Sequence, residues 1–377
     1  MGGILTDLQV PSVTAAEVME GGYQVVDVRS PAEFADGHMP GAINRPLLDD
    51  AQREQVGIVY RHEGAARARV AAMELVSPNL PAYLTSLVDL AASQTRGKRL
   101  VMMCWRGGER SRNAVLLLAL IGVHVLTVAG GYRAYRREVV ARLGAWRPGM
   151  PVFTLYGPTG SGKSALLRAL AEGSPTSRGL RPWPVDLERL ALHRGSLLGG
   201  LNQPGERGQK DFDALLWDEL SRPQGDYLVL EGEGGKIGKI FVPTSVADAI
   251  RGGIPVLVSA PLDRRSDRIM DEYAPDTWDG TDVELFRRGL SHIAPRLPRE
   301  TVLFLESAFD DGRLTDVVRR LLVDYYDPLY QRSCVDGRQF ALEFQTGPDP
   351  AQDARRFMRG AARLIRETAP PDCGGHR

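Results

Sequence analysis

A cysteine, two arginines and a pair of glycines stand together in the segment Cys104–Ser111, which reads CWRGGERS. An apolar run typical of a strand precedes the segment, and a helical pattern follows it. The thiolate is the reactive form of cysteine, and a helix N-terminus with arginines beside it favours that form. The segment therefore predicts a nucleophile, Cys104, at the start of a helix.

The same loop has the features of an anion site. Gly107 and Gly108 permit the tight backbone path that lets N–H groups converge on an anion. Arg110 follows at C-x5-R spacing, where a guanidinium can hold a tetrahedral anion through paired hydrogen bonds, and Arg106 adds a second positive charge. A buried cysteine without chemistry is the alternative for Cys104 alone. The flanking arginines and glycines favour the catalytic interpretation.

A second segment, Gly157–Ser164, matches the phosphate-binding pattern GxxxxGK[ST]. It follows an apolar run at Val152–Tyr156 and precedes a helical pattern at Ala165–Ala171, which is the context that the pattern requires. The predicted phosphate-binding residues are Gly157, Thr159, Gly160, Ser161, Gly162, Lys163 and Ser164. The pattern leaves the ligand open, because ATP, GTP, a prenyl diphosphate and selenophosphate all carry suitable anions.

Other polar residues are candidates for the same phosphate site. Glu231 ends the apolar run Tyr227–Leu230 and could hold Mg²⁺ together with Ser164. A solvated carboxylate at a strand end is the alternative interpretation of Glu231. The further candidates for substrate binding are Asp186, His193 and Arg194.

Short strands and helices that alternate along the chain would position both loops. The predicted strands are Tyr23–Val28, Arg99–Met103, Val123–Val128, Val152–Tyr156, Tyr227–Leu230 and Pro255–Ser259. Helical patterns lie at Ala65–Val76, Pro81–Ala92, Ser111–Ile121, Leu314–Val323 and Ala351–Glu367. Such alternation predicts α/β domains with parallel sheets. A break at Arg147–Pro151 suggests three parts: residues 1–146, residues 151–345, and a helical, arginine-rich tail over 346–377 with a disordered end.

Composition narrows the class of protein. The 47 Lys and Arg residues balance 47 Asp and Glu residues, so a nucleic-acid surface would have to be local. Three cysteines are too few for a disulfide framework or a zinc site of the CxxC type, and they fit a reducing compartment. We expect a cytoplasmic protein, because neither a signal peptide nor an apolar run long enough to span a membrane is found.

The first part of the chain resembles the rhodanese family over roughly residues 10–145. The resemblance rests on DVRSPAEF (27–34), GHMPGAIN (37–44) and the cysteine loop. It implies sulfur or selenium chemistry at Cys104, and we interpret Asp27 and His38 as structural. Simple rhodaneses resemble C-x4-[RK], whereas the longer C-x5-R loop resembles that of rhodanese-fold phosphatases. We therefore expect the loop to admit an anion as large as selenophosphate, although Met103 replaces the histidine typical of those phosphatases.

Over nearly its whole length the chain is similar to the tRNA 2-selenouridine synthase family. Besides both loops, the resemblance rests on Asp186–Ser196, Gln209-Lys210, Glu231–Gly238 and Tyr325–Tyr330. It implies a rhodanese-like domain followed by a P-loop domain that acts on wobble 2-thiouridine in the anticodon stem-loop of tRNA. Selenophosphate and geranyl diphosphate would be co-substrates, and S-geranyl-2-thiouridine the intermediate. Gly232–Gly235 and the tail after residue 345 depart from the family pattern.

Two groups of arginines are candidates for tRNA binding, because arginine attracts RNA phosphates and stacks on bases. They are Arg133, Arg136 and Arg137 in the first part, and Arg355, Arg359 and Arg363 in the tail. A solvated helix face is the alternative interpretation of both groups. Other functions compatible with the two loops are a sulfurtransferase fused to a small-molecule kinase, a regulator that senses anions, and a cysteine-dependent phosphatase.

Overall fold

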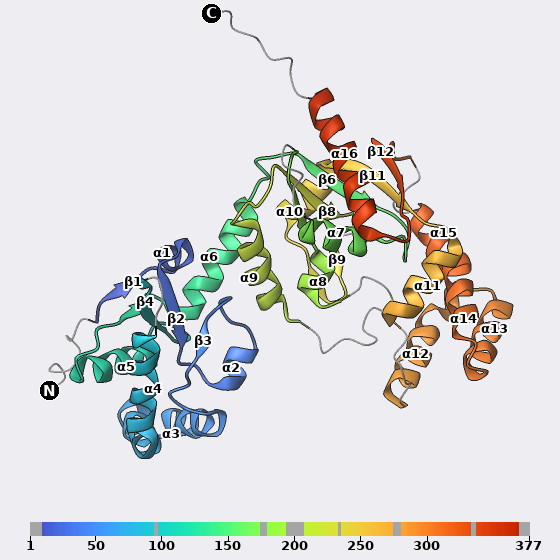
Figure 1. Cartoon of the computed structure of the whole chain (residues 1–377). Helices are drawn as coiled ribbons and strands as arrows, with labels where there is room; N and C mark the ends of the chain where they lie inside the picture. The colour runs from blue at the N-terminus through green and yellow to red at the C-terminus, as the bar shows by residue number, and fades with distance from the viewer. Residues whose placement is uncertain are drawn as a thin grey trace, which may run out of the picture. The chain divides into compact units, whose positions relative to one another are not determined.

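The computed structural model describes residues 10–93, 97–173, 179–193, 207–232, 235–273, 280–332 and 337–368. The chain divides into two compact units, residues 1–143 with 210–218, and residues 144–209 with 219–377. Each unit is built on a five-stranded sheet in which every strand pair is parallel (Figure 1). The predicted α/β class is confirmed in both units.

The sheet of the first unit has the order β1-β5-β4-β2-β3. Its strands are β1 (Ser12–Val13), β2 (Tyr23–Asp27), β3 (Ile43–Asn44), β4 (Arg99–Met103) and β5 (Leu126–Val128). The connecting helices are α1 (Ala15–Glu20), α2 (Pro31–Ala35), α3 (Asp50–Val76), α4 (Leu80–Ala92), α5 (Glu109–Leu120) and α6 (Gly131–Ala145), with a 3₁₀ turn at Ser77–Asn79. The middle strand β4 ends directly before Cys104, so the sheet places the thiol at its carboxyl edge.

One face of this sheet packs against α4 and α5. Leu87 of α4 and Leu118 of α5 are fully buried against Val26 and Met102 of the strands. Cys104 belongs to the same apolar cluster. The cysteine backbone is therefore held by the core of the unit, while its loop continues beyond it.

Helix α3 is a helical hairpin. Gly64 interrupts it at φ 84° and ψ 177°, a conformation open essentially to glycine alone. The amide of Gln52 donates to the carbonyl of Leu75 at 3.4 Å, so the first turn of α3 lies beside its last turn. The sequence predicted only the second half, Ala65–Val76. The first half is a feature that the structure adds.

The second unit has the sheet order β12-β11-β6-β8-β7. Its strands are β6 (Val152–Tyr156), β7 (Pro182–Val185), β8 (Tyr227–Glu231), β11 (Ile254–Ser259) and β12 (Leu342–Gln345), beside a small hairpin of β9 (Lys236–Ile237) and β10 (Ile240–Phe241). Helices α7 (Lys163–Glu172), α8 (Leu187–Ala191) and α10 (Thr244–Gly252) belong to the same unit. The phosphate loop follows the middle strand β6, which is the expected position.

Helix α16 (Pro350–Thr368) is the predicted arginine-rich helix. Its apolar side packs with α7 on the sheet, where Phe357 and Ala361 are fully buried (Figure 1). The helix therefore belongs to the core of the second unit, and the proposed boundary at residue 345 stays a prediction. The end predicted to be disordered, residues 369–377, lies outside the described residues.

A group of helices extends the second unit between β11 and β12. They are α11 (Leu262–Tyr273), α12 (Gly280–Ile293), a 3₁₀ turn at Ala294–Arg296, α13 (Arg299–Asp310), α14 (Leu314–Leu321), a π-helical turn at Leu322–Tyr326 and α15 (Asp327–Tyr330). Leu290, Leu305 and Val317 form part of their own apolar cluster. Of these helices the sequence predicted only α14.

Helix α9 (Gln209–Leu220) is encoded in the second half of the sequence, but its residues 210–218 belong to the first unit. Asp213 accepts a hydrogen bond from Arg136 of α6 at 2.5 Å, and Asp211 accepts one from the backbone N–H of His38 at 3.1 Å. The approach is close, because a Cβ on Gly37 would lie 2.8 Å from the Cβ of Lys210. The first unit therefore extends beyond the predicted residues 1–146.

Within the described residues, no helix is both long and apolar enough to cross a membrane.

Candidate active sites

Cys104 lies where the sequence placed it, at the N-terminus of α5. Its Sγ accepts a hydrogen bond from the backbone N–H of Gly108 at 3.2 Å and lies 3.2 Å from the hydroxyl of Ser111. Gly108 is the N-cap residue of α5, so the sulfur faces the positive end of the helix. The residue is a free thiol and only 3% exposed. The low exposure of the sulfur restricts what can reach it.

The loop after Cys104 has little freedom to move. Gly107 has φ +64°, and a Cβ at this position would lie 2.6 Å from the carbonyl oxygen of Val128. The backbone N–H of Tyr132 donates to the carbonyl of Cys104 at 2.9 Å. The loop is thus fixed between the end of β5 and the start of α6. Because it is fixed, its N–H groups are already arranged for a ligand.

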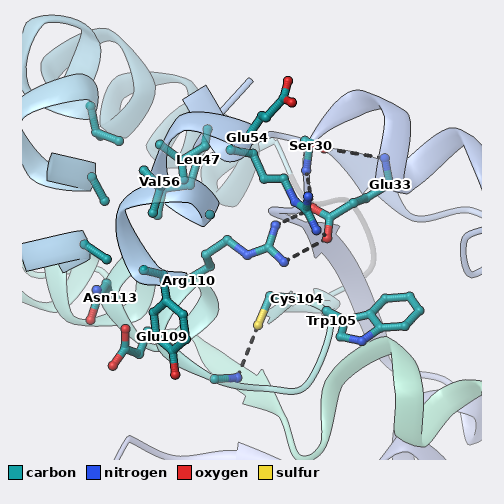
Figure 2. Close-up of a pocket in the computed structure, with 18 of the residues that line it drawn as sticks. Ser30, Glu33, Leu47, Glu54, Val56, Cys104, Trp105, Glu109, Arg110 and Asn113 are labelled. Carbon is teal, nitrogen blue, oxygen red and sulfur yellow. Dashed lines mark hydrogen bonds and ion pairs between the residues drawn. The ribbon is translucent and has the colours of Figure 1, made fainter. Parts of the chain in front are cut away.

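Arg110, predicted to hold an anion, forms a two-point ion pair with Glu33 of α2, with one N–O distance of 3.0 Å (Figure 2). Burial raises the pKa of Glu33, but the hydrogen bond and charge of Arg110 and a bond from the Ser30 backbone outweigh it, so the net pKa is below the ordinary value. The guanidinium is therefore neutralised by Glu33. An anion bound at this loop has to compete with that carboxylate or use the donors that remain.

A cavity of about 1020 Å³ opens beside the cysteine loop. Cys104, Arg106, Gly108 and Arg110 all line it, and α3 supplies much of the opposite wall (Figure 2). The structure thus brings four of the five predicted catalytic residues to one cavity wall. The sequence did not predict the cavity, because its other wall comes from residues distant in the chain.

The DVRSPAEF and GHMPG segments are linked to each other by a buried arginine, Arg29. Arg29 is fully buried and donates to both carboxylate oxygens of Asp27 at 2.6–3.0 Å. The same guanidinium donates to the carbonyls of Glu33 and Gly37 at 2.9 and 2.8 Å, and lies 4.0 Å from the ring centre of Tyr132. Arg29 therefore connects the strand end at Asp27 to the helix that carries Glu33.

The phosphate loop of the second unit has the expected backbone form. Gly160 and Gly162 have φ of +76° and +95°, which turns successive N–H groups toward one side. A Cβ on Gly160 would lie 2.8 Å from the carbonyl oxygen of Arg265. Lys163 Nζ donates to the carbonyl of Gly157 at 2.6 Å across the loop. All seven predicted phosphate-binding residues lie on this loop or in the first turn of α7.

Two carboxylates lie at the same edge of the sheet. Ser164 Oγ donates to Glu231 Oε1 at 3.0 Å, and Glu231 is fully buried. The strand register pairs Leu155 with Glu231 and Val185 with Leu230, so Asp186, the residue directly after β7, lies at the edge that carries Glu231. Burial raises the pKa of Asp186, although its carboxylate caps α8 by accepting from the backbone N–H of Arg189 at 2.8 Å.

The hydroxyl of Ser164 and the carboxylate of Glu231 are hard oxygen ligands of the kind that Mg²⁺ prefers, so this pair fits the predicted metal. Among the described residues there is no cluster of three or more His, Cys, Asp or Glu side chains that could hold a metal ion. His193 packs against Gly238, where a Cβ would lie 2.6 Å from the imidazole ring. Arg194 lies outside the described residues.

Arg265 and Arg268 of α11 are site residues that the sequence analysis missed. Arg265 donates to the carbonyl of Thr159 at 2.8 Å and pairs with both carboxylate oxygens of Asp327 at 2.5–2.9 Å. Arg268 donates to the carbonyl of Gly160 at 3.2 Å. Two positive charges therefore support the phosphate loop. The sequence feature that could have identified Arg265 is the Tyr325–Tyr330 segment, because its Asp327 binds that arginine.

The candidate tRNA-binding arginines differ in their surroundings. Arg133 and Arg137 are exposed on α6, whereas Arg136 is bound to Asp213. On α16, Arg355, Arg359 and Arg363 are all exposed. Arg355 lies 3.8 Å from Asp349, and Arg363 lies 3.8 Å from Glu367. The exposed members can reach an RNA backbone, and RNA binding stays a prediction.

A cysteine loop on a rhodanese sheet and a phosphate loop on a second parallel sheet define a two-unit protein of the rhodanese–P-loop class. The family model for the rhodanese-like domain matches residues 11–138. The model for the tRNA 2-selenouridine synthase AAA domain matches residues 150–349. The chain belongs to the tRNA 2-selenouridine synthase family.

Curated relatives are similar in sequence to this chain over most of its length. A tRNA 2-selenouridine synthase from Hydrogenovibrio crunogenus is 31% identical over 353 residues, covering 87% of this chain and 94% of the relative. One from Bdellovibrio bacteriovorus is 32% identical over 346 residues, covering 81% of this chain and 87% of the relative. One from Photobacterium profundum is 31% identical over 333 residues, with the same two coverages of 81% and 87%.

Proposed function

We propose that this protein converts wobble 2-thiouridine of tRNA to 2-selenouridine in two steps, S-geranylation followed by replacement of the alkylated sulfur by selenium. The observation that carries the proposal is the presence of a buried thiol at a helix N-terminus and a complete phosphate loop in one chain of this family. The curated relatives carry the name of this synthase. S-alkylation is chemically useful here, because an alkylated sulfur leaves as a thiol whereas a thiocarbonyl sulfur is a poor leaving group.

In the first step the phosphate loop binds the diphosphate of geranyl diphosphate. The sulfur of 2-thiouridine attacks the first carbon of the geranyl group, the carbon–oxygen bond breaks, and diphosphate leaves with the electron pair. Lys163 and the loop amides stabilise the negative charge that develops on the diphosphate. Ser164 and Glu231 would hold Mg²⁺, which when bound would neutralise further charge there.

In the second step the cysteine loop binds selenophosphate. Selenium attacks C2 of the nucleobase and geranylthiol leaves; water then cleaves the selenium–phosphorus bond and releases phosphate. The loop N–H groups and Arg106 favour an anion beside the reacting carbon. Cys104 serves this step, where its thiol can supply the proton that the departing geranylthiolate takes up.

The tRNA substrate gives the exposed arginines a role. Arg133 and Arg137 lie on the unit that carries the cysteine loop, and Arg359 and Arg363 lie on α16. Contacts to RNA phosphates release counterions, so binding weakens as salt concentration rises. Reversing the charge of Arg359 and Arg363 should therefore lower tRNA affinity and reduce its dependence on salt.

Nucleoside mass spectrometry on RNA that carries 2-thiouridine tests the proposal. With geranyl diphosphate and selenophosphate, the protein should produce S-geranyl-2-thiouridine and then 2-selenouridine. Cys104→Ala should lower 2-selenouridine formation by about 100-fold or more and leave geranylation intact, in line with loss of a group that acts in one step. Lys163→Ala should lower the formation of S-geranyl-2-thiouridine. It should still convert RNA that is already geranylated to 2-selenouridine.

Two outcomes would contradict this assignment. Loss of selenation alone in Lys163→Ala would remove geranyl diphosphate from the phosphate loop. No new nucleoside, with phosphate transferred to a small acceptor instead, would favour a sulfurtransferase fused to a small-molecule kinase.

A further inference from the structure

The helical hairpin α3 has few buried side chains for its length. Of its 27 residues, Ala68, Ala71 and Val76 are the buried ones, and two of these are small. Tyr60 and Met73 are 61% and 49% exposed, yet both line the cavity beside Cys104. Large apolar side chains that face an open cavity indicate a binding surface when the cavity also holds reactive groups.

The cavity has two chemically different walls. The cysteine loop provides the thiol and two arginines, while the far wall has an apolar stretch bordered by charged side chains such as Glu54 (Figure 2). The apolar stretch consists of Leu47, Val56, Ala68, Ala72, Met73 and Val76. A ligand that fits both walls has a polar reacting centre at Cys104 and an apolar chain that extends from it toward α3.

We propose that this cavity binds the geranyl chain of S-geranyl-2-thiouridine while selenium displaces the sulfur. The inference rests on the proposed function, which supplies the S-geranyl group. The geranyl sulfur is both the atom that must reach the cysteine loop and the atom that carries the chain. A ligand oriented this way places the reacting carbon at the loop and the ten-carbon chain against the hairpin.

The size of the cavity agrees with this occupant. At about 1020 Å³ it lies at the upper end of the range for small-molecule sites, so a nucleobase and a ten-carbon chain can both enter. Burial of the chain would select the geranylated RNA over the starting 2-thiouridine. Each buried methylene contributes roughly a fourfold increase in affinity. The second step would thus act on S-geranyl-2-thiouridine, and unmodified 2-thiouridine would remain a substrate of the first step only.

Glu33 and Arg110 lie at the border between the two walls (Figure 2). Their ion pair is polar but adds no net charge to the cavity. An uncompensated charge here would be unfavourable beside an apolar chain. The pair therefore lets one cavity hold an anionic donor at the loop and a hydrocarbon beyond it.

A pair of matched variants tests the inference by RNA binding without selenophosphate. Ala72 lines the cavity and Ala66 is exposed on the same half of the hairpin outside it. The probes are an anticodon stem-loop with S-geranyl-2-thiouridine and the same RNA with S-methyl-2-thiouridine. Wild type should prefer the geranyl probe by about 30-fold or more. Ala72→Phe, which fills the cavity, should lower that preference at least tenfold, and Ala66→Phe should leave it unchanged.

A second variant covers the case in which Ala72→Phe does not fold. Met73→Gln changes an exposed side chain of similar length, and should lower the geranyl preference several-fold with no change in affinity for the methyl probe. An unchanged preference in both cavity variants, or an equal loss in Ala66→Phe, would overturn the inference.

The outcomes separate this inference from the function on which it rests. If wild type binds both probes equally but still converts the geranyl probe to 2-selenouridine with selenophosphate, the cavity assignment fails and the function stands. If wild type neither prefers nor converts the geranyl probe, both fail.

Discussion

At the scale of single residues, the anion site at Cys104 depends on Glu33, a carboxylate 77 positions before the arginine that it binds. Arg110 has the spacing expected for an anion ligand, but its guanidinium is held by Glu33 and its side chain is 23% exposed. Glu33 in turn belongs to the N-terminal cap of α2 through Ser30. The loop therefore presents its N–H groups and Arg106 as its readily available anion donors.

The Glu33–Arg110 pair should contribute stability that depends on pH. Because the pKa of Glu33 is below its ordinary value of 4.5, the contribution is present above that value and is lost as pH falls through the lowered pKa. Glu33→Gln should lower the free energy of unfolding by about 1–3 kcal/mol near neutral pH. The difference from wild type should shrink below pH ~4.5, as measured by urea unfolding at several pH values.

Glu63→Gln is the control, since Glu63 pairs with Arg67 at 3.7 Å with both side chains more than half exposed. Exposed pairs of this kind contribute roughly 0–1 kcal/mol. Equal effects of the two substitutions, or a pH-independent effect of Glu33→Gln, would show that the buried pair has no special role.

The sequence could predict the residues of each loop because a loop's chemistry lies within eight consecutive positions. Cys104–Ser111 and Gly157–Ser164 contain both the reactive groups and the glycines that shape them. Glu33 and Asp327 could not be assigned in this way. Each acts on an arginine 77 or 62 positions distant, and such contacts are set by the fold.

At the scale of elements, periodicity identified some helices that face the core and missed others. The predicted helices at 81–92 and 111–121 became α4 and α5, whose apolar sides pack on the first sheet. The first half of α3 was missed, because its apolar residues face a cavity and so follow no core-facing pattern. Helix α9 was also missed, and its polar contacts to the first unit carry no local signal.

The contact between Arg136 and Asp213 should anchor α9 to the first unit. The Asp213 side chain is 8% exposed and that of Arg136 is 23% exposed, so either partner left alone would be poorly solvated. A double-mutant cycle of Arg136→Ala and Asp213→Ala should give a coupling free energy of about 1–3 kcal/mol in urea unfolding. The Lys210–Asp36 pair, with side chains 37% and 67% exposed, is the control and should couple by less than ~1 kcal/mol. A cycle at Arg136 no larger than this control would argue against the anchor.

At the scale of the whole molecule, the chain passes between its two units three times, after residues 143, 209 and 218. The sequence predicted a boundary near the first crossing, because Arg147–Pro151 is a local break between two patterns, and that domain boundary stays a prediction. It did not locate the return through α9, which depends on contacts with residues about 75 or more positions earlier, such as Trp217 with Arg142. The units were thus predictable as folds, whereas the path of the chain between them was not.

This path predicts that residues 1–146 alone are an incomplete unit. Without α9, Arg136 and the backbone N–H of His38 lose Asp213 and Asp211 as partners. At roughly 1–1.5 kcal/mol for each lost hydrogen bond, and a few degrees for each kcal/mol in a unit of this size, the melting temperature should fall by about 5–15 °C. Fusing residues 207–222 to this fragment through a flexible linker should restore most of the loss in a thermal melt. The same fusion carrying Asp211→Ala and Asp213→Ala should not restore it. If the fragment alone has the same melting temperature as the fused protein, α9 covers the first unit without stabilising it.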